Sequence, residues 1–134
     1  MAIDRIDWHS EAENYPQDMP YENGGNHIGY FIEYLYKHDF LPDFDSGEHE
    51  PQECLAVKNG EKSGLEFLLR DCDGKFWDAD TNAEGLEFTE YIYDKYLSNL
   101  YDILGHSPYE TDYSEEDYRK AEQWLDKEFE EWKK

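Results

Sequence analysis

The 134 residues carry 34 acidic and 12 basic side chains, which gives a formal charge of −22 at pH 7. This acid excess disfavours binding to nucleic acid or anionic lipid, because such polyanions need basic patches, and it favours a basic partner instead. The length suits one domain, which we expect to cover residues 1–134. Aromatic residues make up 17% of the chain, so we expect an ordered core built largely from rings.

The sequence gives no sign of export or of membrane insertion. No basic start followed by an apolar segment is present, and the most apolar stretch, HIGYFIEYLY, is interrupted by Glu33. We therefore expect a cytoplasmic protein that is a monomer or a small homo-oligomer. In that compartment Cys54 and Cys72 are expected to be free thiols on buried helix faces, because a disulfide needs oxidising conditions.

The first twenty residues show no sustained period and contain two prolines. We expect them to form an irregular but ordered arm that lays Ile6, Trp8 and Tyr15 across the core. From Asn26 the pattern changes, and apolar residues at i, i+3, i+4 and i+7 predict a first helix that ends near Asp39. The residues that set this period are Ile28, Phe31, Ile32 and Leu35.

Two shorter helices are predicted next. Pro51 suits a first helical turn and Asn59-Gly60 suits a helix end, so a short helix is expected between them. Ser63 and Glu66 match a capping box and open another helix, which Gly74 terminates. Its apolar positions are Leu65, Leu68, Leu69 and Cys72. The following KFWDAD, residues 75–80, could form a short extended piece.

Two longer helices complete the pattern. Thr81 and Glu84 form a capping box that opens an aromatic helix running to Gly105, and its two apolar stripes indicate a central position. Ser114 and Asp117 open the last helix, whose predicted buried side comprises Tyr118, Ala121, Leu125, Phe129 and Trp132. The predicted fold class is therefore mainly α, a small single-domain bundle of about five helices with an irregular N-terminal arm.

His27 is the residue that most suggests chemistry, because it lies in the first turn of the first predicted helix. There the unpaired N–H groups and the positive end of the helix dipole favour a neutral imidazole that could act as a general base. The alternative is structural, with Asn23 or Asn26 capping the helix and His27 packing locally. We favour the structural interpretation, because no relay partner stands at a recognisable spacing. The sequence leaves open whether His9 meets His27 in space.

Other chemical readings are weaker. In the acidic run of residues 71–80, an EF-hand register starting at Asp78 puts Ala83 at the glycine position and Thr89 at the glutamate position, so a solvated turn is expected. Carboxylate pairs for glycoside hydrolysis carry no weight among 34 acids. The chain also lacks the common catalytic signatures. We expect no cofactor, no metal and no catalytic residue, hence a binding protein rather than an enzyme.

Four stretches carry a resemblance to a known family: DWH at residues 7–9, YPQDMPYENGGNHIGYFIEYL at 15–35, DCDGKFWDADTNAEG at 71–85 and YIYDKYLSNLYDIL at 91–104. The Trp-His pair and the Glu-Asn-Gly-Gly-x-His-Ile-Gly motif resemble those of a family of small, acidic, uncharacterised bacterial proteins. Its members look like the immunity proteins that accompany bacterial antagonistic toxins. The sequence departs from the family at Glu33 and Tyr34, where a more apolar helix is expected, so no binding face is carried over.

The leading hypothesis is therefore an immunity protein that binds and blocks a cognate protein toxin with a basic surface. Acidic residues would steer association, while exposed aromatic anchors would hold the complex. Two loops combine rings with acids and supply the predicted contact residues, which are Trp77, Asp78 and Asp80 in one loop and Tyr109, Glu110, Asp112, Tyr113 and Glu115 in the other. The alternatives are a small hydrolytic enzyme using carboxylates or His9 with His27, and an acidic mimic of nucleic acid.

Overall fold

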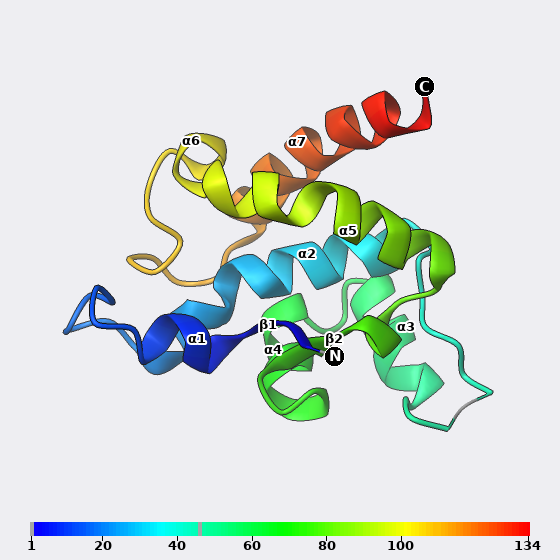
Figure 1. Ribbon diagram of the computed structural model, residues 1–134. Helices are drawn as coiled ribbons and strands as arrows, with labels where there is room; N and C mark the ends of the chain where they lie inside the picture. The colour runs from blue at the N-terminus through cyan, green and yellow to red at the C-terminus, as the bar shows by residue number, and fades with distance from the viewer. Residues whose placement is uncertain (1, 46) are drawn as a thin grey trace.

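Helix α2 (Asn26–Lys37) forms the centre of the molecule in the computed structural model, which describes residues 2–45 and 47–134. Every residue from Asn26 to Tyr36 is buried, so α2 has protein on all sides. Figure 1 shows α5 and α7 on one side of α2, and α3, α4 and the two-stranded sheet on the other. The expectation that the long aromatic helix is the central one is wrong, because α5 buries only one of its faces.

The N-terminal segment is more regular than its sequence predicts. It begins with strand β1 (Ala2–Arg5) and helix α1 (Ile6–Ser10), and after a series of turns the 3-10 helix η1 (Tyr21–Gly25) leads directly into α2. Ile6 is buried as expected and Tyr15 is half-buried. Trp8, however, is 54% exposed, so it does not lie across the core. The sequence misses β1 because its partner strand lies far along the chain.

That partner is strand β2 (Lys75–Trp77), which pairs antiparallel with β1. The register places Ala2 opposite Trp77 and Asp4 opposite Phe76, so two steps along β1 match one step along β2. Such a bulge bends the strand and redirects its side chains. Asp4, just after the irregularity, is 2% exposed. The short extended piece expected at residues 75–80 is confirmed over Lys75–Trp77, and the 3-10 helix η2 (Asp78–Asp80) follows it.

Local signals place α3 and α4 correctly. Helix α3 (Pro51–Lys58) has its proline in the first turn, as predicted. Helix α4 (Gly64–Asp71) is capped by Ser63, whose hydroxyl accepts a hydrogen bond of 3.0 Å from the backbone N–H of Glu66. Cys54 is buried in α3, Cys72 is half-buried after α4, and both are free thiols.

The C-terminal half differs from the prediction in two places. Helix α5 (Ala83–Ser98) is capped by Asn82, whereas the hydroxyl of Thr81 donates to the carbonyl of Phe40 at 2.7 Å, so the capping role given to Thr81 is wrong. The chain also breaks at Asn99, and α6 (Leu100–Leu104) is a separate helix. Helix α7 (Glu115–Lys133) is capped by Ser114 as predicted. The mainly α fold class is confirmed, with seven α-helices among the described residues rather than about five.

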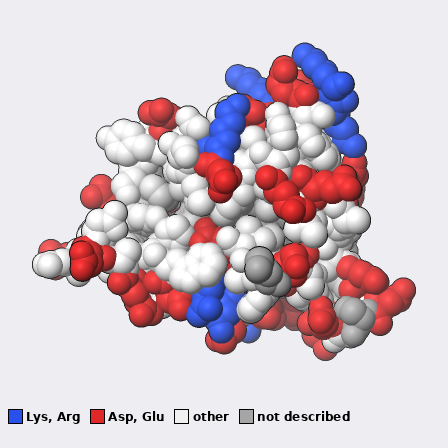
Figure 2. All heavy atoms as spheres, in the orientation of Figure 1, with Lys and Arg blue, Asp and Glu red and all other residues white. Residues whose placement is uncertain are grey.

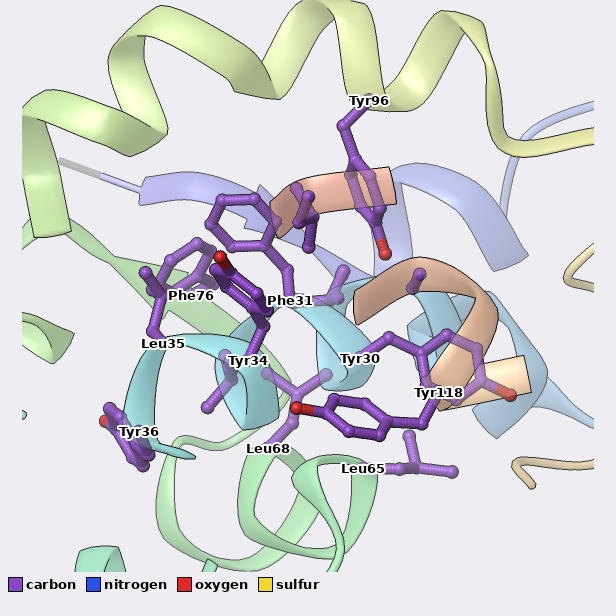
Figure 3. Packing of buried hydrophobic residues seen from close by; sticks show 14 of the residues in the cluster. Tyr30, Phe31, Tyr34, Leu35, Tyr36, Leu65, Leu68, Phe76, Tyr96 and Tyr118 are labelled. Carbon is purple, nitrogen blue, oxygen red and sulfur yellow. The ribbon is translucent and has the colours of Figure 1, made fainter. Parts of the chain in front are cut away.

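Rings dominate the core, as the composition predicts (Figure 3). The ring of Phe31 has four aromatic neighbours at centroid distances of 5.0–6.5 Å: Phe76, Phe88, Tyr93 and Tyr96. Each such pair contributes about 0.5–1.5 kcal/mol beyond the burial of apolar area. Helices α2 and α4 approach so closely that a Cβ on Gly64 would lie 1.9 Å from the carbonyl oxygen of Gly29. None of the described helices is long and apolar enough to cross a membrane.

Candidate functional site

The buried carboxylate of Asp4 is the meeting point of three elements. Nε2 of His9 lies 2.7 Å from its Oδ1 and Nε2 of His27 lies 2.9 Å from its Oδ2. Since an ionised carboxylate only accepts, both Nε2 atoms carry the proton and donate. The hydroxyl of Tyr93 donates to Oδ2 at 2.7 Å, and the backbone N–H of Arg5 donates to Oδ1 at 2.8 Å. We name the group of Asp4, His9, His27, Tyr93 and Tyr109 the Asp4 hub.

Two histidines from different elements meet in this hub. The rings of His9, in α1, and His27, in the first turn of α2, lie edge to face with centroids 4.3 Å apart. Glycines allow this approach, because a Cβ on Gly24 would lie 2.0 Å from the Oγ of Ser10 and one on Gly25 would lie 2.7 Å from Ile6. The question that the sequence leaves open is thus answered. His27 therefore has polar partners in space, Asp4 and His9, although no spacing in the sequence reveals them.

The electrostatics of the hub favour an ionised Asp4 carboxylate beside a neutral His27. Burial alone would raise the pKa of the Asp4 carboxyl, but hydrogen bonds and charge from His27 and His9 outweigh it and hold that pKa well below its usual range. Burial lowers the pKa of His27, although Asp4 acts in the opposite direction. Burial and the neighbouring carboxylate raise the pKa of Tyr93 well above its usual value. At neutral pH the hub therefore holds a buried carboxylate to which a neutral His27 and a neutral Tyr93 donate.

The Nδ1 atoms of the two histidines differ in their hydrogen bonding. Nδ1 of His9 lies 2.6 Å from the hydroxyl of Tyr109, which donates to it while Nε2 carries the proton. Nδ1 of His27 is buried and has no hydrogen-bond partner among the described residues. Burial first, and then the charge of Asp4, raise the pKa of Tyr109 to about 12, so the phenol keeps its proton at neutral pH.

The asparagines expected to cap α2 instead hold the loop between α6 and α7. The capping position is occupied by Gly25, which has no side-chain hydrogen bond to offer. Asn23 donates to the carbonyl of Tyr109 at 2.9 Å, and Asn26 donates to that of Thr111 at 2.8 Å. The capping roles given to both asparagines are therefore wrong. These bonds fix the loop that carries Tyr109 against the start of α2.

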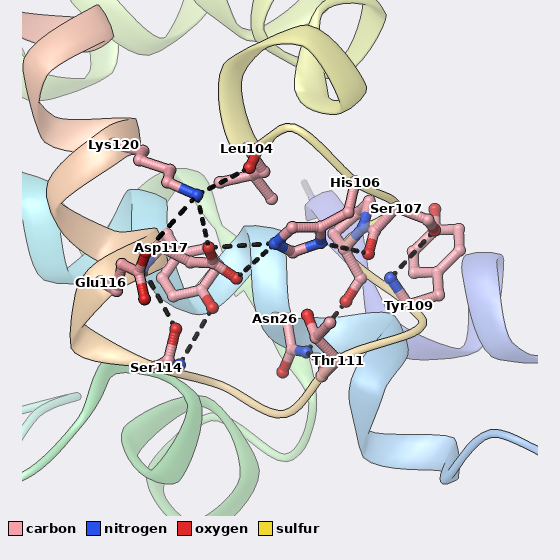
Figure 4. A network of polar contacts seen from close by, with 12 residues as sticks. Asn26, Leu104, His106, Ser107, Tyr109, Thr111, Ser114, Glu116, Asp117 and Lys120 are labelled. Atoms are coloured by element: carbon pink, nitrogen blue, oxygen red, sulfur yellow. Dashed lines mark hydrogen bonds and ion pairs between the residues drawn. The ribbon is translucent and has the colours of Figure 1, made fainter.

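A second histidine–carboxylate contact closes the same loop, as Figure 4 shows. Nδ1 of His106 donates to the carbonyl of Ser107 at 3.0 Å, and Nε2 lies 3.0 Å from Asp117 in α7. The hydrogen bond to Ser107 is the main cause of a raised His106 pKa; burial opposes it, and Asp117 adds to it. Lys120 lies 3.7 Å from Asp117 and donates to the carbonyl of Leu104 at 3.0 Å.

The predicted contact residues of this loop divide into two groups. Glu110, Asp112 and Glu115 are exposed, as a contact role requires. Tyr113 is half-buried, because its ring stacks on Tyr30 at 4.3 Å and its hydroxyl donates to Glu33 at 2.6 Å. Tyr109 is likewise half-buried and belongs to the hub. The assumption that both tyrosines are exposed anchors is therefore wrong.

The other predicted loop lines a hollow with a volume of about 510 Å³. We name it the acid hollow; its lining residues are Glu48, His49, Asp71, Cys72, Asp73, Trp77, Asp78, Ala79 and Asp80. Trp77 is 38% exposed and Asp78 is exposed, as expected. Asp80 is buried, contrary to expectation, because it accepts from the backbone N–H of Trp77 at 2.7 Å and pairs with His49 at 3.0 Å. Burial is the main cause of its raised pKa.

Most basic side chains are already close to carboxylates of the same chain. Among the described residues, every Lys and Arg except Lys127 lies no farther than 3.9 Å from a carboxylate of the same chain. Figure 2 shows acidic side chains at the lower right of this face, over the segment that leads into α3, and along its lower edge. Figure 1 places β2, next to the acid hollow, well apart from the loop between α6 and α7.

Fold and site together define a small, acidic, mainly helical domain with an Asp-His-His cluster beneath its surface. The chain belongs to the DUF7832 family, a domain of unknown function, whose model matches residues 2–127. Neither a curated protein nor a solved structure shows significant similarity to the chain. Reasoning from the sequence missed Asp4 and Tyr93. The only available signal was Asp4 five residues before His9, a spacing with no recognised meaning.

Proposed function

We propose that the protein is a toxin-neutralising immunity protein that binds a basic surface of a cognate bacterial effector and has no enzymatic activity of its own. The observation that carries the proposal is the acid hollow, where five carboxyl groups and the exposed edge of Trp77 surround one concave space. No Lys or Arg is among the lining residues. A lysine or arginine side chain of a partner would complement this space in charge.

Charge and anchor have separate roles in this proposal. The net charge of −22 acts over about 8 Å at physiological salt and speeds encounter with a basic surface. Exposed ion pairs contribute only about 0.2–1 kcal/mol each, so charge by itself does not hold a complex. A cation over the ring of Trp77 adds about 0.5–2 kcal/mol as it loses water. The proposed complex is steered by acid and held near Trp77.

The meeting of His9 and His27 makes a hydrolytic enzyme the second candidate. Both Nε2 atoms, however, donate to the same carboxylate, and Nδ1 of His9 accepts from Tyr109. The basic nitrogen that remains, Nδ1 of His27, belongs to a side chain with 0% exposure. A substrate would have to displace the hub to reach it. The geometry therefore supports a binding protein more strongly than a general base.

The test is co-expression with a toxin encoded beside the gene, followed by purification of the complex and measurement of its rates at several salt concentrations. Association should slow as salt rises, while dissociation changes little. Trp77→Ala should speed dissociation by about tenfold, the equivalent of 1.4 kcal/mol. Tyr101→Ala is the matched control, because Tyr101 is 67% exposed and lies on α6.

A second pair of variants locates the steering charge. Asp73→Asn with Asp78→Asn removes two charges from the acid hollow, whereas Glu87→Gln with Glu90→Gln removes two from the exposed side of α5. The first pair should slow association more than the second. Equal slowing would show that the hollow is not the docking point. If the cells die, no complex forms and the purified protein turns over a substrate, the inhibitor hypothesis is wrong and the enzyme hypothesis replaces it.

A further inference from the structure

We propose that Asp4, His9 and His27 form a binding site for a zinc-type transition-metal ion. Each of the three residues offers one ligand atom, and these atoms all lie within 4.8 Å of one another. Two imidazole nitrogens with one carboxylate oxygen form a donor set that zinc and related divalent ions take, whereas calcium and magnesium prefer oxygen alone. Three protein ligands leave one position for a water molecule.

The distances are close to those that an ion requires. Ligand atoms around a tetrahedral zinc ion with bonds near 2.0–2.1 Å lie about 3.3 Å apart. The two Nε2 atoms lie 2.7 Å and 2.9 Å from the carboxylate oxygens of Asp4. An ion placed between a ring and its carboxylate oxygen would therefore need that contact to open by roughly 0.5 Å.

Both Nε2 atoms can become metal ligands without breaking a hydrogen bond at Nδ1 of either histidine. Coordination requires each neutral imidazole to move its proton from Nε2 to Nδ1, a change of tautomer that releases no net proton. In His9, Nδ1–H then donates to the hydroxyl of Tyr109, which lies 2.6 Å away and only reverses its role. In His27, Nδ1 has no partner that the change could break.

Outer contacts already orient two of the three proposed ligands, Asp4 and His9, as they do in protein metal sites. Tyr93 and the backbone N–H of Arg5 hold the Asp4 oxygens, and Tyr109 holds His9. The side chains of Asp4 and His27 are at most 3% exposed, while that of His9 is 17% exposed, so an ion would enter past His9. Bound there, it would fasten β1 and α1 to the start of α2.

The other histidines of the chain provide an internal comparison. His38 pairs with Glu122 at 3.0 Å and His106 with Asp117 at 3.0 Å. Within residues 2–45 and 47–134, however, the hub is the group of three in which the ligand atoms all lie within 4.8 Å of one another. Removing the histidine of such a pair thus tests whether metal affinity comes from the three residues of the hub or from isolated histidine–carboxylate pairs near the surface.

The experiment is titration of chelator-treated, full-length protein with ZnCl₂ by calorimetry, and with Co²⁺ by visible absorption. Wild-type protein should bind one ion per chain and should melt at a higher temperature with zinc. His9→Gln, the most exposed ligand position, should weaken binding by at least about 100-fold and abolish the rise in melting temperature. Tyr109→Phe should weaken it by roughly tenfold. His106→Gln is the matched control and should bind as the wild type does.

Equal affinity of wild type and His9→Gln would overturn the proposal, as would the absence of Co²⁺ ligand-field bands in the wild type. Loss of affinity in His106→Gln as large as in His9→Gln would also overturn it, because it would show binding by surface histidines. If circular dichroism shows that His9→Gln does not fold, Tyr109→Phe decides, since it removes only one hydroxyl. Unchanged affinity in that variant then refutes the proposal.

Discussion

Replacing Asp4 by asparagine probes the hub most directly, because the amide keeps the shape of the side chain and removes its charge. One half of the amide accepts hydrogen bonds and the other half donates them. The backbone N–H of Arg5 cannot change its direction, so the amide oxygen should face Arg5 and His9. The amide NH₂ then faces His27 and Tyr93, both of which donate to Asp4 in the wild-type protein.

The cost follows from what these two partners can do. His27 can change tautomer and accept from the NH₂ group, but the buried hydroxyl of Tyr93 then loses its acceptor. A hydrogen bond to a charged group contributes about 1.5–3 kcal/mol, and the three surviving bonds weaken once the charge is gone. We therefore expect Asp4→Asn to lower the free energy of unfolding by about 3–4 kcal/mol, or the melting temperature by roughly 10–15 °C.

Urea and thermal unfolding, both in the presence of a chelator, measure this loss. The matched control is Asp7→Asn, three residues further on, where the half-exposed carboxylate pairs with Arg5 at 2.7 Å. That change should cost less than about 1 kcal/mol. Tyr93→Phe removes only the phenolic hydrogen bond and should fall between the two. Equal stability of Asp4→Asn and Asp7→Asn would refute the view that the Asp4 carboxylate holds the hub together.

Three further outcomes follow from particular contacts. Gly64→Ala should destabilise by about 3 kcal/mol, seen in urea unfolding, because its Cβ would lie 1.9 Å from a backbone carbonyl of α2. Gly60→Ala meets no atom within 4 Å but has a φ of +81°, so it should lose only about 1–2 kcal/mol, through left-handed strain without a clash. Tyr113→Phe should lower the free energy of unfolding by about 1.5 kcal/mol through the lost bond to Glu33, while binding of a partner stays unchanged. For His106, a pKa raised chiefly by the Ser107 carbonyl means that the folded state holds the proton more tightly. Its stabilisation is present below about pH 6.5 and disappears as pH rises through the raised pKa, so His106→Gln should destabilise more in acid than in base.

Elements with local signals could be predicted from the sequence. The caps at Ser63 and Ser114 and the proline that opens α3 act within one helical turn, so each is readable in a few residues. The break at Asn99 has no such signal, because apolar residues continue through it into α6. Thr81 and Asn82 are both good caps, and only the carbonyl of Phe40, distant in sequence, engages Thr81 and leaves the cap to Asn82.

The candidate site was less accessible to sequence reasoning. Its members come from β1, α1, α2, α5 and the loop between α6 and α7, so no spacing in the chain joins Asp4 to Tyr93. Glu33 shows the same limit, since it reads as an interruption of an apolar stretch yet is buried and accepts from Gly64 and Tyr113. A loop that mixes tyrosine with acids does not reveal which side its rings face. That direction is decided by the helix on which the loop packs.

The buried hub and the acid hollow are connected through the two-stranded sheet. Hydrogen bonds from α1, α2 and α5 fix Asp4 at the bulge of β1, and β1 in turn pairs with β2, with Ala2 opposite Trp77. The position of Trp77 on the surface therefore depends on a strand that the hub anchors. A bound ion would tighten this anchor without touching a partner in the hollow, since its proposed ligands are not among the residues that line the hollow. If the hub is weakened, we therefore expect β1 and Trp77 to shift before the helices around α2 unfold.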